Sequence, residues 1–391
     1  GAQDPAPDGA DVVTLDALGA SDAAGDPSDG ANAADDTTSQ VAPDVAHDAI
    51  GEDTALDAGA PPPVRFALPD LSGPRTDSLV AMPGLIGVQP AVAVGAHGDP
   101  LVVFAGTPGA EGDLGIYGSF AGQPTIALKT EPSGQRNEPS ICRLSGGGFV
   151  AAWSFDGQAA GGTLGIEGAR LDPQGALIET FTVTTEVDGN HWLGHVGCQP
   201  DGGFTVVGSR TDTDDTTFGV FAQAYTEDGE PQGAPFGVNP TPEGTQVQPV
   251  IGLGPGGAGV VIYEDAPADG SYALTARGVG PSGVVGDAFT LLSFEGVDCL
   301  RPAVAVAGNG AVAYAGNLGV QVHVLGAPSI GTPEPSATWL ETTGSQGLPA
   351  LTFLGDADTL ALAMIDNLTG AGEPHIAVQL LGEGLDPTTS V

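Results

Sequence analysis

The sequence contains very few basic residues and no long apolar run. Lys129 is its only lysine, and nine Lys plus Arg stand against 49 Asp plus Glu, which gives a formal net charge of −40. A surface of this charge repels nucleic acid and anionic membranes, so we expect neither as a partner. No stretch of 18 apolar residues occurs, so the sequence predicts no transmembrane segment.

Signatures of catalysis are also missing. The sequence has no G-x-S-x-G elbow, no H-E-x-x-H, no phosphate-binding loop and no paired zinc cysteines. With 49 acidic residues, some carboxylate pairs arise by chance and do not by themselves indicate a glycosidase. Composition and motifs therefore favour a protein that is not an enzyme.

What the sequence does contain is one motif repeated six times. The anchors are 47 to 55 residues apart, a period typical of solenoids and propellers, in which one unit buries its apolar faces only against its neighbours. The copies are QPAVAV, EPSICRL, GHVGCQP, QPVIGLG, RPAVAVAG and LPALTFLG, with anchors at Pro90, Pro139, Gly194, Pro249, Pro302 and Pro349.

Each repeat predicts four β-strands, because short apolar runs with period-two alternation are separated by Gly, Pro, Asp and Asn. The fourth strand repeats one apolar residue, one intervening residue and one aliphatic residue, as in Phe181 and Val183. The last repeat lacks such a strand, and Phe66 and Leu68 in VRFALPD carry its pattern at the other end. We therefore predict an all-β fold, a six-bladed β-propeller over residues 63–391 closed by an N-terminal strand.

Residues 1–62 differ from the rest of the chain. They carry 14 Asp plus Glu, no Lys or Arg, and otherwise mostly Ala, Gly, Pro, Ser and Thr. This composition predicts a disordered acidic tether, and an ordered docking arm is the alternative.

Cys142 and Cys198 lie on the innermost strands of consecutive repeats, and Cys299 is the third cysteine. Two buried thiols are the expectation for Cys142 and Cys198, and a disulfide between them is the alternative.

A propeller collects two sets of loops on one face, and in this chain those loops are long and acidic. Asp212, Asp214 and Asp215 in TDTDDTT alternate as the oxygen ligands of a hard cation do, but the segment lacks the glycine and the terminal Glu of an EF-hand loop. A solvated acidic loop is the simpler interpretation, and a calcium site is the alternative.

The same face is the predicted partner-binding surface, because binding residues concentrate on loops held by a rigid scaffold. His191 and His195 in HWLGH are read as imidazoles without a metal, since only a helix would bring residues at this spacing together. Trp192 either packs against the neighbouring blade or anchors a protein or a sugar. The predicted partner-binding residues are Asp188, His191, Trp192, Asp212 and Asp269.

The repeats resemble propeller-forming repeats of large exported bacterial proteins of the RTX and adhesin-like types, most closely in DGGFTVV, GGGFVAAW and GVFAQAYTEDGEPQGAPFGVN. The Asp, Ala and Pro-rich start is similar to the tethers of bacterial surface lipoproteins, although their lipid-bearing cysteine is absent from this sequence. The resemblance implies export to the cell surface, the outer membrane or the medium, and a lipid anchor.

These observations favour a non-enzymatic protein that presents a propeller face to a protein partner in a surface assembly. A carbohydrate-binding module, with a glycan as partner, is the first alternative. A propeller enzyme acting on an extracellular polymer is the second.

Overall fold

The computed structural model describes the chain from Leu85 onward, and the predicted tether at residues 1–62 and the strand VRFALPD lie outside the described residues. All regular structure in the described part is β, apart from one 3-10 turn at Pro255–Gly257 (η2), and no helix there is long and apolar enough to cross a membrane. The predicted all-β class is confirmed. The described part excludes residues 109–112, 121–122, 132–133, 157–163, 185–190, 212–217, 241–243, 267–271, 294–298, 319–320, 328, 332, 336, 342–345, 355–358, 367–374, 382–386 and 391.

The strands follow one another in antiparallel groups of four. The first two groups are β1 (Leu85–Val94), β2 (Pro100–Pro108), β3 (Gly115–Phe120) and β4 (Ile126–Lys129), then β5 (Gln135–Arg143), β6 (Phe149–Asp156), β7 (Leu164–Leu171) and β8 (Leu177–Thr182). The next two are β9 (His191–Cys198), β10 (Phe204–Thr211), β11 (Phe218–Tyr225) and β12 (Phe236–Gly237), then β13 (Thr245–Leu253), β14 (Gly259–Ala266), β15 (Ala273–Gly280) and β16 (Gly283–Ser293). The last two are β17 (Cys299–Val306), β18 (Val312–Leu318), β19 (Gln321–Ala327) and β20 (Ala337–Glu341), then β21 (Gln346–Leu354), β22 (Thr359–Asp366), β23 (His375–Leu381) and β24 (Pro387–Ser390). One parallel pairing, Phe218 with Thr245, joins the groups β9–β12 and β13–β16 into a single eight-stranded sheet.

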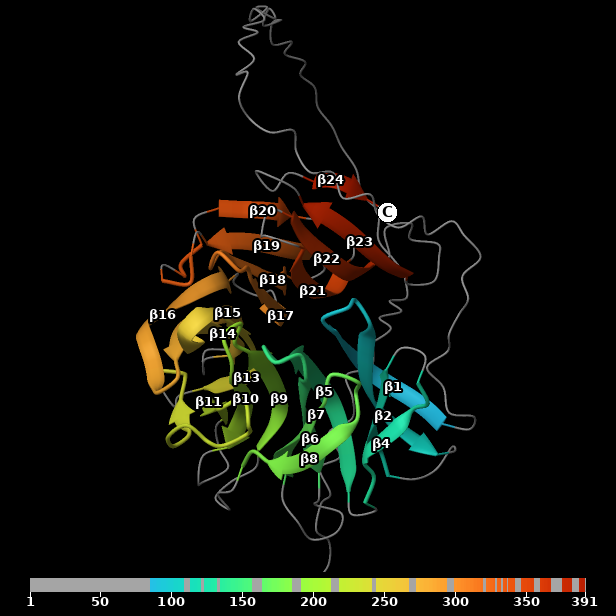
Figure 1. Cartoon of the computed structure of the whole chain (residues 1–391). Helices are drawn as coiled ribbons and strands as arrows, with labels where there is room; N and C mark the ends of the chain where they lie inside the picture. Colours follow the sequence, from blue (N-terminus) through green and yellow to red (C-terminus); the bar gives the residue numbers. More distant parts are fainter. Residues whose placement is uncertain are drawn as a thin grey trace, which may run out of the picture. The chain divides into compact units, whose positions relative to one another are not determined.

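The groups pack face to face, and the first strand of each lies toward the middle of the molecule (Figure 1). Each hydrophobic cluster draws residues from two consecutive groups. Trp153 of β6, for example, is fully buried among residues of β2 and β3. This arrangement explains the period of the sequence, because the apolar face of one sheet is covered only when the next repeat follows it.

The last group corrects one prediction. Residues Gln379, Leu380 and Leu381 of β23 pair with β24, so this group has a fourth strand from the C-terminal end of the chain. The prediction that the last repeat lacks a fourth strand is therefore wrong. PTTS has none of the apolar alternation used to find strands, which is why the sequence did not indicate it.

A disulfide joins β5 to β9. Cys142 and Cys198 have Cα atoms 5.6 Å apart, so the expected pair of free thiols is wrong and the alternative is correct. The bond connects the innermost strands of two consecutive groups, beside the cluster that contains Val196 and Phe204.

The turns between first and second strands are short and nearly identical. In the five turns that the structure describes, the residue that opens the turn donates its N–H to the carbonyl oxygen four residues later, as Leu144 does to Gly148 at 2.8 Å and Ala307 does to Ala311 at 2.8 Å. Gly147 and Gly310 have φ of 95° and 88°, a conformation that costs glycine little. The described turns between first and second strands are therefore tight.

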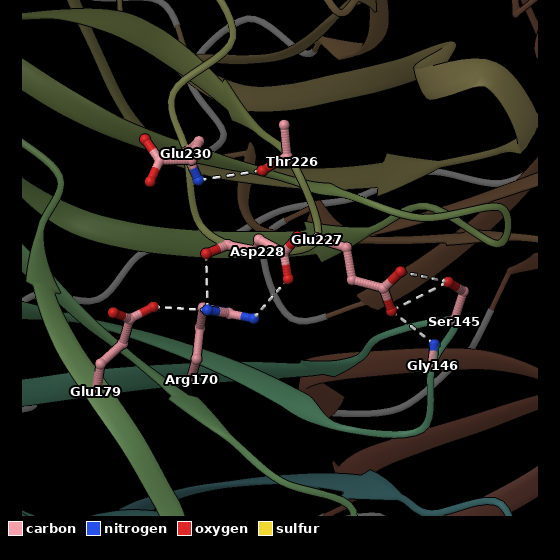
Figure 2. Close-up of polar contacts among 8 residues, drawn as sticks. All are labelled: Ser145, Gly146, Arg170, Glu179, Thr226, Glu227, Asp228 and Glu230. Atoms are coloured by element: carbon pink, nitrogen blue, oxygen red, sulfur yellow. Dashed lines mark hydrogen bonds and ion pairs between the residues drawn. The ribbon is translucent and has the colours of Figure 1, made fainter.

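On the same face the β11–β12 turn reaches over to the preceding group (Figure 2). The Glu227 carboxylate accepts hydrogen bonds from the Gly146 N–H at 2.6 Å and from the Ser145 hydroxyl. Arg170 donates to the Asp228 carbonyl oxygen at 2.7 Å and to Glu179 at 2.6 Å. These contacts connect two consecutive groups, and since Glu227 and Asp228 are on the surface, each contributes little energy.

Removing the disulfide with Cys142→Ser and Cys198→Ser should lower the free energy of unfolding by about 2–4 kcal/mol, because the unfolded chain regains a long loop. Urea unfolding with and without reductant measures the effect. Cys299→Ser is the matched control and should unfold like the parent. Equal urea midpoints for the double variant and the parent would contradict the bond.

His195 predicts a pH dependence. Its Nδ1 accepts the Ile251 N–H at 3.4 Å across two groups, and burial lowers its pKa from 6.5 to about 4. Between pH 6.5 and about pH 4, His195 binds a proton in the unfolded chain but stays neutral in the folded chain. The free energy of unfolding therefore falls as the pH is lowered through this range. The loss should reach about 3 kcal/mol. Urea midpoints between pH 7 and pH 4 test this, and His195→Gln should show a shallower slope.

Candidate functional site

The innermost strands share a bulge at the repeated anchor. The residue before the anchor is Gln89, Glu138, Leu193, Gln248 or Leu348, and these five non-glycine residues have φ between 50° and 56°. The ladder to the second strand shifts at the same point, for example between Asn137 and Ser140 and between Val247 and Val250. The anchor motif of the sequence is therefore the signature of a bulge.

This bulge is costly and is repeated all the same. A left-handed conformation costs an L-residue about 1–2 kcal/mol, and it persists only where the surroundings hold it. Proline follows four of the five residues and has no N–H, so the interrupted ladder leaves no donor unpaired there. The bulge turns one side chain per repeat out of the ladder, and bulges of this kind are frequent beside functional sites.

Hydrogen bonds connect the bulges of consecutive groups. The Glu138 N–H donates to Gln89 Oε1 at 2.9 Å. Glu138 Oε2 accepts from the Ser154 hydroxyl at 3.3 Å, and Ser154 Oγ in turn accepts the Leu193 N–H at 2.8 Å. The side chains at this level thus run from β1 through β5 and β6 to β9, between the inner edges of three sheets.

We call this level the axial layer. It comprises the five bulge residues and, in each of the six groups, the second-strand residue that pairs with the last first-strand residue before the register shift. These second-strand residues are Ala105, Ser154, Ser209, Glu264, Asn317 and Ile365.

Two carboxylates belong to the axial layer. Glu138 is exposed on β5, and Glu264 on β14 is 5% exposed. They come from groups that are separated along the chain by the β9–β12 group. Gln89, Gln248 and Asn317 add amide groups, and the Ser209 hydroxyl is fully buried without a protein partner in the described part. The layer offers acids together with neutral donors and acceptors.

A buried arginine supports the start of β5, two residues before Glu138. Arg136 is 1% exposed; its Nε donates to Glu167 at 2.9 Å, and the guanidinium lies 4.5 Å from the centre of the Phe155 ring. Trp153 donates its indole N–H to the same Glu167 oxygen at 3.0 Å. A hydrogen bond from Lys129 lowers the pKa of Glu131, whose carbonyl oxygen also binds Arg136. These contacts hold the strand that carries Glu138.

Of the predicted partner and calcium residues, the structure describes His191 and Trp192. His191 is buried at the start of β9, with its ring against Phe221, and Trp192 is partly buried with its ring centre 4.6 Å from that of Phe218. The Trp192 ring thus packs against an aromatic ring of its own group. No cluster of metal ligands occurs among the described residues. The other predicted partner and calcium residues, Asp188, Asp212, Asp214, Asp215 and Asp269, lie outside the described residues.

Glu138 and Glu264 were not singled out by the sequence analysis, which treated individual acids as uninformative. A signal existed for Glu138, because it directly precedes the anchor Pro139. Glu264 has no such mark, since its place opposite a bulge depends on the register of β13 with β14.

Comparison with known proteins shows the fold. No protein-family model and no curated protein matches the chain. Among solved structures, a protein of unknown function from Dyadobacter fermentans matches with a TM-score of 0.54 at 12% identity, over 76% of this chain and 94% of that one. A GH93 alpha-L-arabinofuranosidase of Fusarium graminearum, in complex with arabinobiose, matches with 0.50 at 13% identity, over 76% and 93%. An alpha-L-arabinanase of Penicillium chrysogenum, also with arabinobiose, matches with 0.50 at 16% identity, over 77% and 94%.

These similarities correct the functional prediction. The expected non-enzymatic partner-binding protein is contradicted, because solved structures with this fold include an arabinofuranosidase and an arabinanase. The alternative of a propeller enzyme that acts on an extracellular polymer is better supported. The chain is thus an all-β propeller whose structural neighbours include glycoside hydrolases.

Proposed function

We propose that this protein hydrolyses glycosidic bonds of an extracellular polysaccharide, and that the axial layer is its active site. The observation that carries the proposal is the presence of Glu138 and Glu264 in this layer, on separate sheets. The two solved neighbours that bind arabinobiose support the class of substrate.

The chemistry requires two carboxyl groups. Most glycosidases use one as the general acid that protonates the leaving oxygen and the other as the base or nucleophile. Glu138 is exposed and accepts a hydrogen bond from Ser154, as suits a carboxylate that acts as base or nucleophile. Glu264 is shielded from water and takes the role of proton donor.

Neutral groups of the same layer would bind the sugar. Gln89 and Gln248 stand at bulges, and Asn317 occupies the place of Glu264 in the next group. Amide groups can donate to and accept from sugar hydroxyls at once. The exposed part of the layer carries no cation among the residues described there, which favours a neutral polysaccharide.

An axial site requires that the groups form a ring. We propose a six-bladed propeller over residues 63–391, completed by the segment around Phe66 and Leu68, and preceded by a tether at residues 1–62. Export is part of the proposal, because disulfides such as Cys142–Cys198 persist in oxidising compartments. A lipid anchor and a place at the cell surface remain proposals that rest on the resemblance of the tether and of the repeats.

The test is hydrolysis by the full chain of arabinan and of a panel of neutral polysaccharides, followed as reducing ends. Glu138→Gln and Glu264→Gln should each lower kcat by roughly 10²–10⁴-fold, because each removes proton transfer or nucleophilic attack. Glu227→Gln, on the short-turn face, is the matched control and should keep full activity.

Thermal melting separates catalysis from folding, and the proposal requires that Glu138→Gln melt like the parent. Binding of a polysaccharide without release of reducing ends would instead indicate a carbohydrate-binding module. Full activity in both active-site variants would place the reaction outside the axial layer.

A further inference from the structure

A buried serine hydroxyl lies between the acid of its own group and the bulge of the next group. Ser154 of β6 is 5% exposed, and its backbone pairs with Asn137, the residue before Glu138. Its Oγ accepts the Leu193 N–H of β9 at 2.8 Å. The Glu138 carboxylate is its other neighbour, with Oε2 at 3.3 Å from Ser154 Oγ. The hydroxyl thus has one partner in each of two groups.

The Leu193 N–H fixes the direction in which this hydroxyl donates. A backbone N–H only donates, so Ser154 Oγ receives it through a lone pair. Serine has a single hydroxyl hydrogen, and an ionised carboxylate only accepts. The hydrogen of Ser154 is therefore directed to Glu138 Oε2. Donation runs in one direction, from Leu193 through Ser154 to Glu138.

The bulge of β9 supplies the first donor of this chain. Leu193 has a φ of 56°, and the ladder between β9 and β10 shifts at this point, so its N–H is turned toward the preceding group. A second buried serine provides a contrast. Ser140 of β5 accepts the Val196 N–H of β9 at 3.0 Å, but its other contacts are to backbone carbonyl oxygens. Both serines connect to β9, and Ser154 in addition contacts a carboxylate of the axial layer.

The two strands that carry this contact are anchored to one buried acid. Arg136 of β5 and Trp153 of β6 both donate to Glu167 Oε2, at 2.9 Å and 3.0 Å. Trp153 directly precedes Ser154, and Arg136 lies two residues before Glu138. The separation of the hydroxyl from the carboxylate is therefore set by buried contacts on both strands.

We propose that Ser154 is a positioning residue that holds the Glu138 carboxylate in its charged form and in a fixed orientation. The inference rests on the proposed function, in which Glu138 acts as base or nucleophile and must be ionised to do so. A hydrogen bond donated to a carboxylate favours the charged form. A length of 3.3 Å is long for such a bond, and catalytic hydrogen bonds often tighten when the substrate binds.

Other ionisable groups lie on the strands around Glu138. The strands that pack against β5 are β1, β2, β3, β6 and β9, of which β1 and β2 carry no ionisable residue. Burial lowers the pKa of His195 to about 4, and Arg136 is bound by Glu167. The ionisable residues of β3, β5, β6 and β9, apart from Glu138, are Tyr117, Arg136, Arg143, Asp156, His191 and His195. All of them stay in place when Ser154 is replaced, so a change in the titration of Glu138 reports the hydroxyl.

The titration of Glu138 tests the hydrogen bond in the full chain. With glutamate labelled at the carboxyl carbon, NMR follows the Glu138 resonance, which is identified by its absence in Glu138→Gln. Ser154→Ala should move the midpoint of this titration to higher pH, because the charged form loses a donor. Ser140→Ala is the matched control, since it also removes a buried hydroxyl that binds β9, and should leave the midpoint unchanged. An unchanged midpoint in Ser154→Ala, or an equal change in both variants, would overturn the proposal.

A second variant keeps the test decisive if Ser154→Ala does not fold. Ser154→Cys is close to serine in size, and its thiol is a weak donor, so it should move the midpoint in the same direction. Thermal melting shows which variants are folded. A folded Ser154→Cys variant with the midpoint of the parent would equally contradict the positioning role.

Kinetics give a separate readout on a polysaccharide that the chain hydrolyses. Ser154→Ala should lower kcat/KM by roughly 10-fold and move the acid limb of the pH–rate profile to higher pH, whereas Ser140→Ala should keep the limb of the parent. The two proposals fail separately. A moved midpoint in a chain that hydrolyses nothing would reject the proposed function and retain the role of Ser154. An active chain whose midpoint does not respond to Ser154→Ala would reject the role of Ser154 alone.

Discussion

Burial of one sheet face against the next is the constraint on which the rest of the structure depends. A four-stranded sheet has two faces, and each hydrophobic cluster here is built from two consecutive groups. Phe204 and Tyr225, stacked 4.9 Å apart, are buried in a cluster in which Phe181 of the preceding group lies against both rings. Burying one aromatic or aliphatic side chain contributes about 1.5–3 kcal/mol to the free energy of folding. A group that lost one neighbour would expose an apolar face and would lose this contribution for each side chain on that face.

The arginines of the chain also connect consecutive groups to one another. Arg170 binds Asp228 of the next group, and Arg277 donates to the Val238 carbonyl oxygen of the preceding one at 2.8 Å. Arg136 holds the crossover from the first group to the second through Glu131. In a chain with a net charge of −40, these arginines join sheets and do little to neutralise the surface. Repulsion between the acids therefore acts against contacts that rest mainly on apolar packing.

The period of the sequence predicted the fold well, because the same apolar faces must recur in each repeat. In the third repeat the short apolar runs HVGCQ, GFTVVGSR and GVFAQAYT coincide with β9, β10 and β11. The short strand β24 escaped prediction since a run of Thr and Ser has no apolar alternation. The Cys142–Cys198 pairing could not be derived either, because it depends on how closely two innermost strands approach.

The axial layer was hidden from sequence reasoning for a different reason. A bulge shifts the register by one residue, so the residue opposite it cannot be identified from alternation alone. Glu264 is then one acid among 49, and only the register of β13 with β14 places it opposite the residue before a bulge. The repeated cost of five left-handed residues is offset by the cores on both sides of each innermost strand. The rigid packing between the sheets can thus hold polar side chains in the axial layer, although these side chains do not belong to the hydrophobic core.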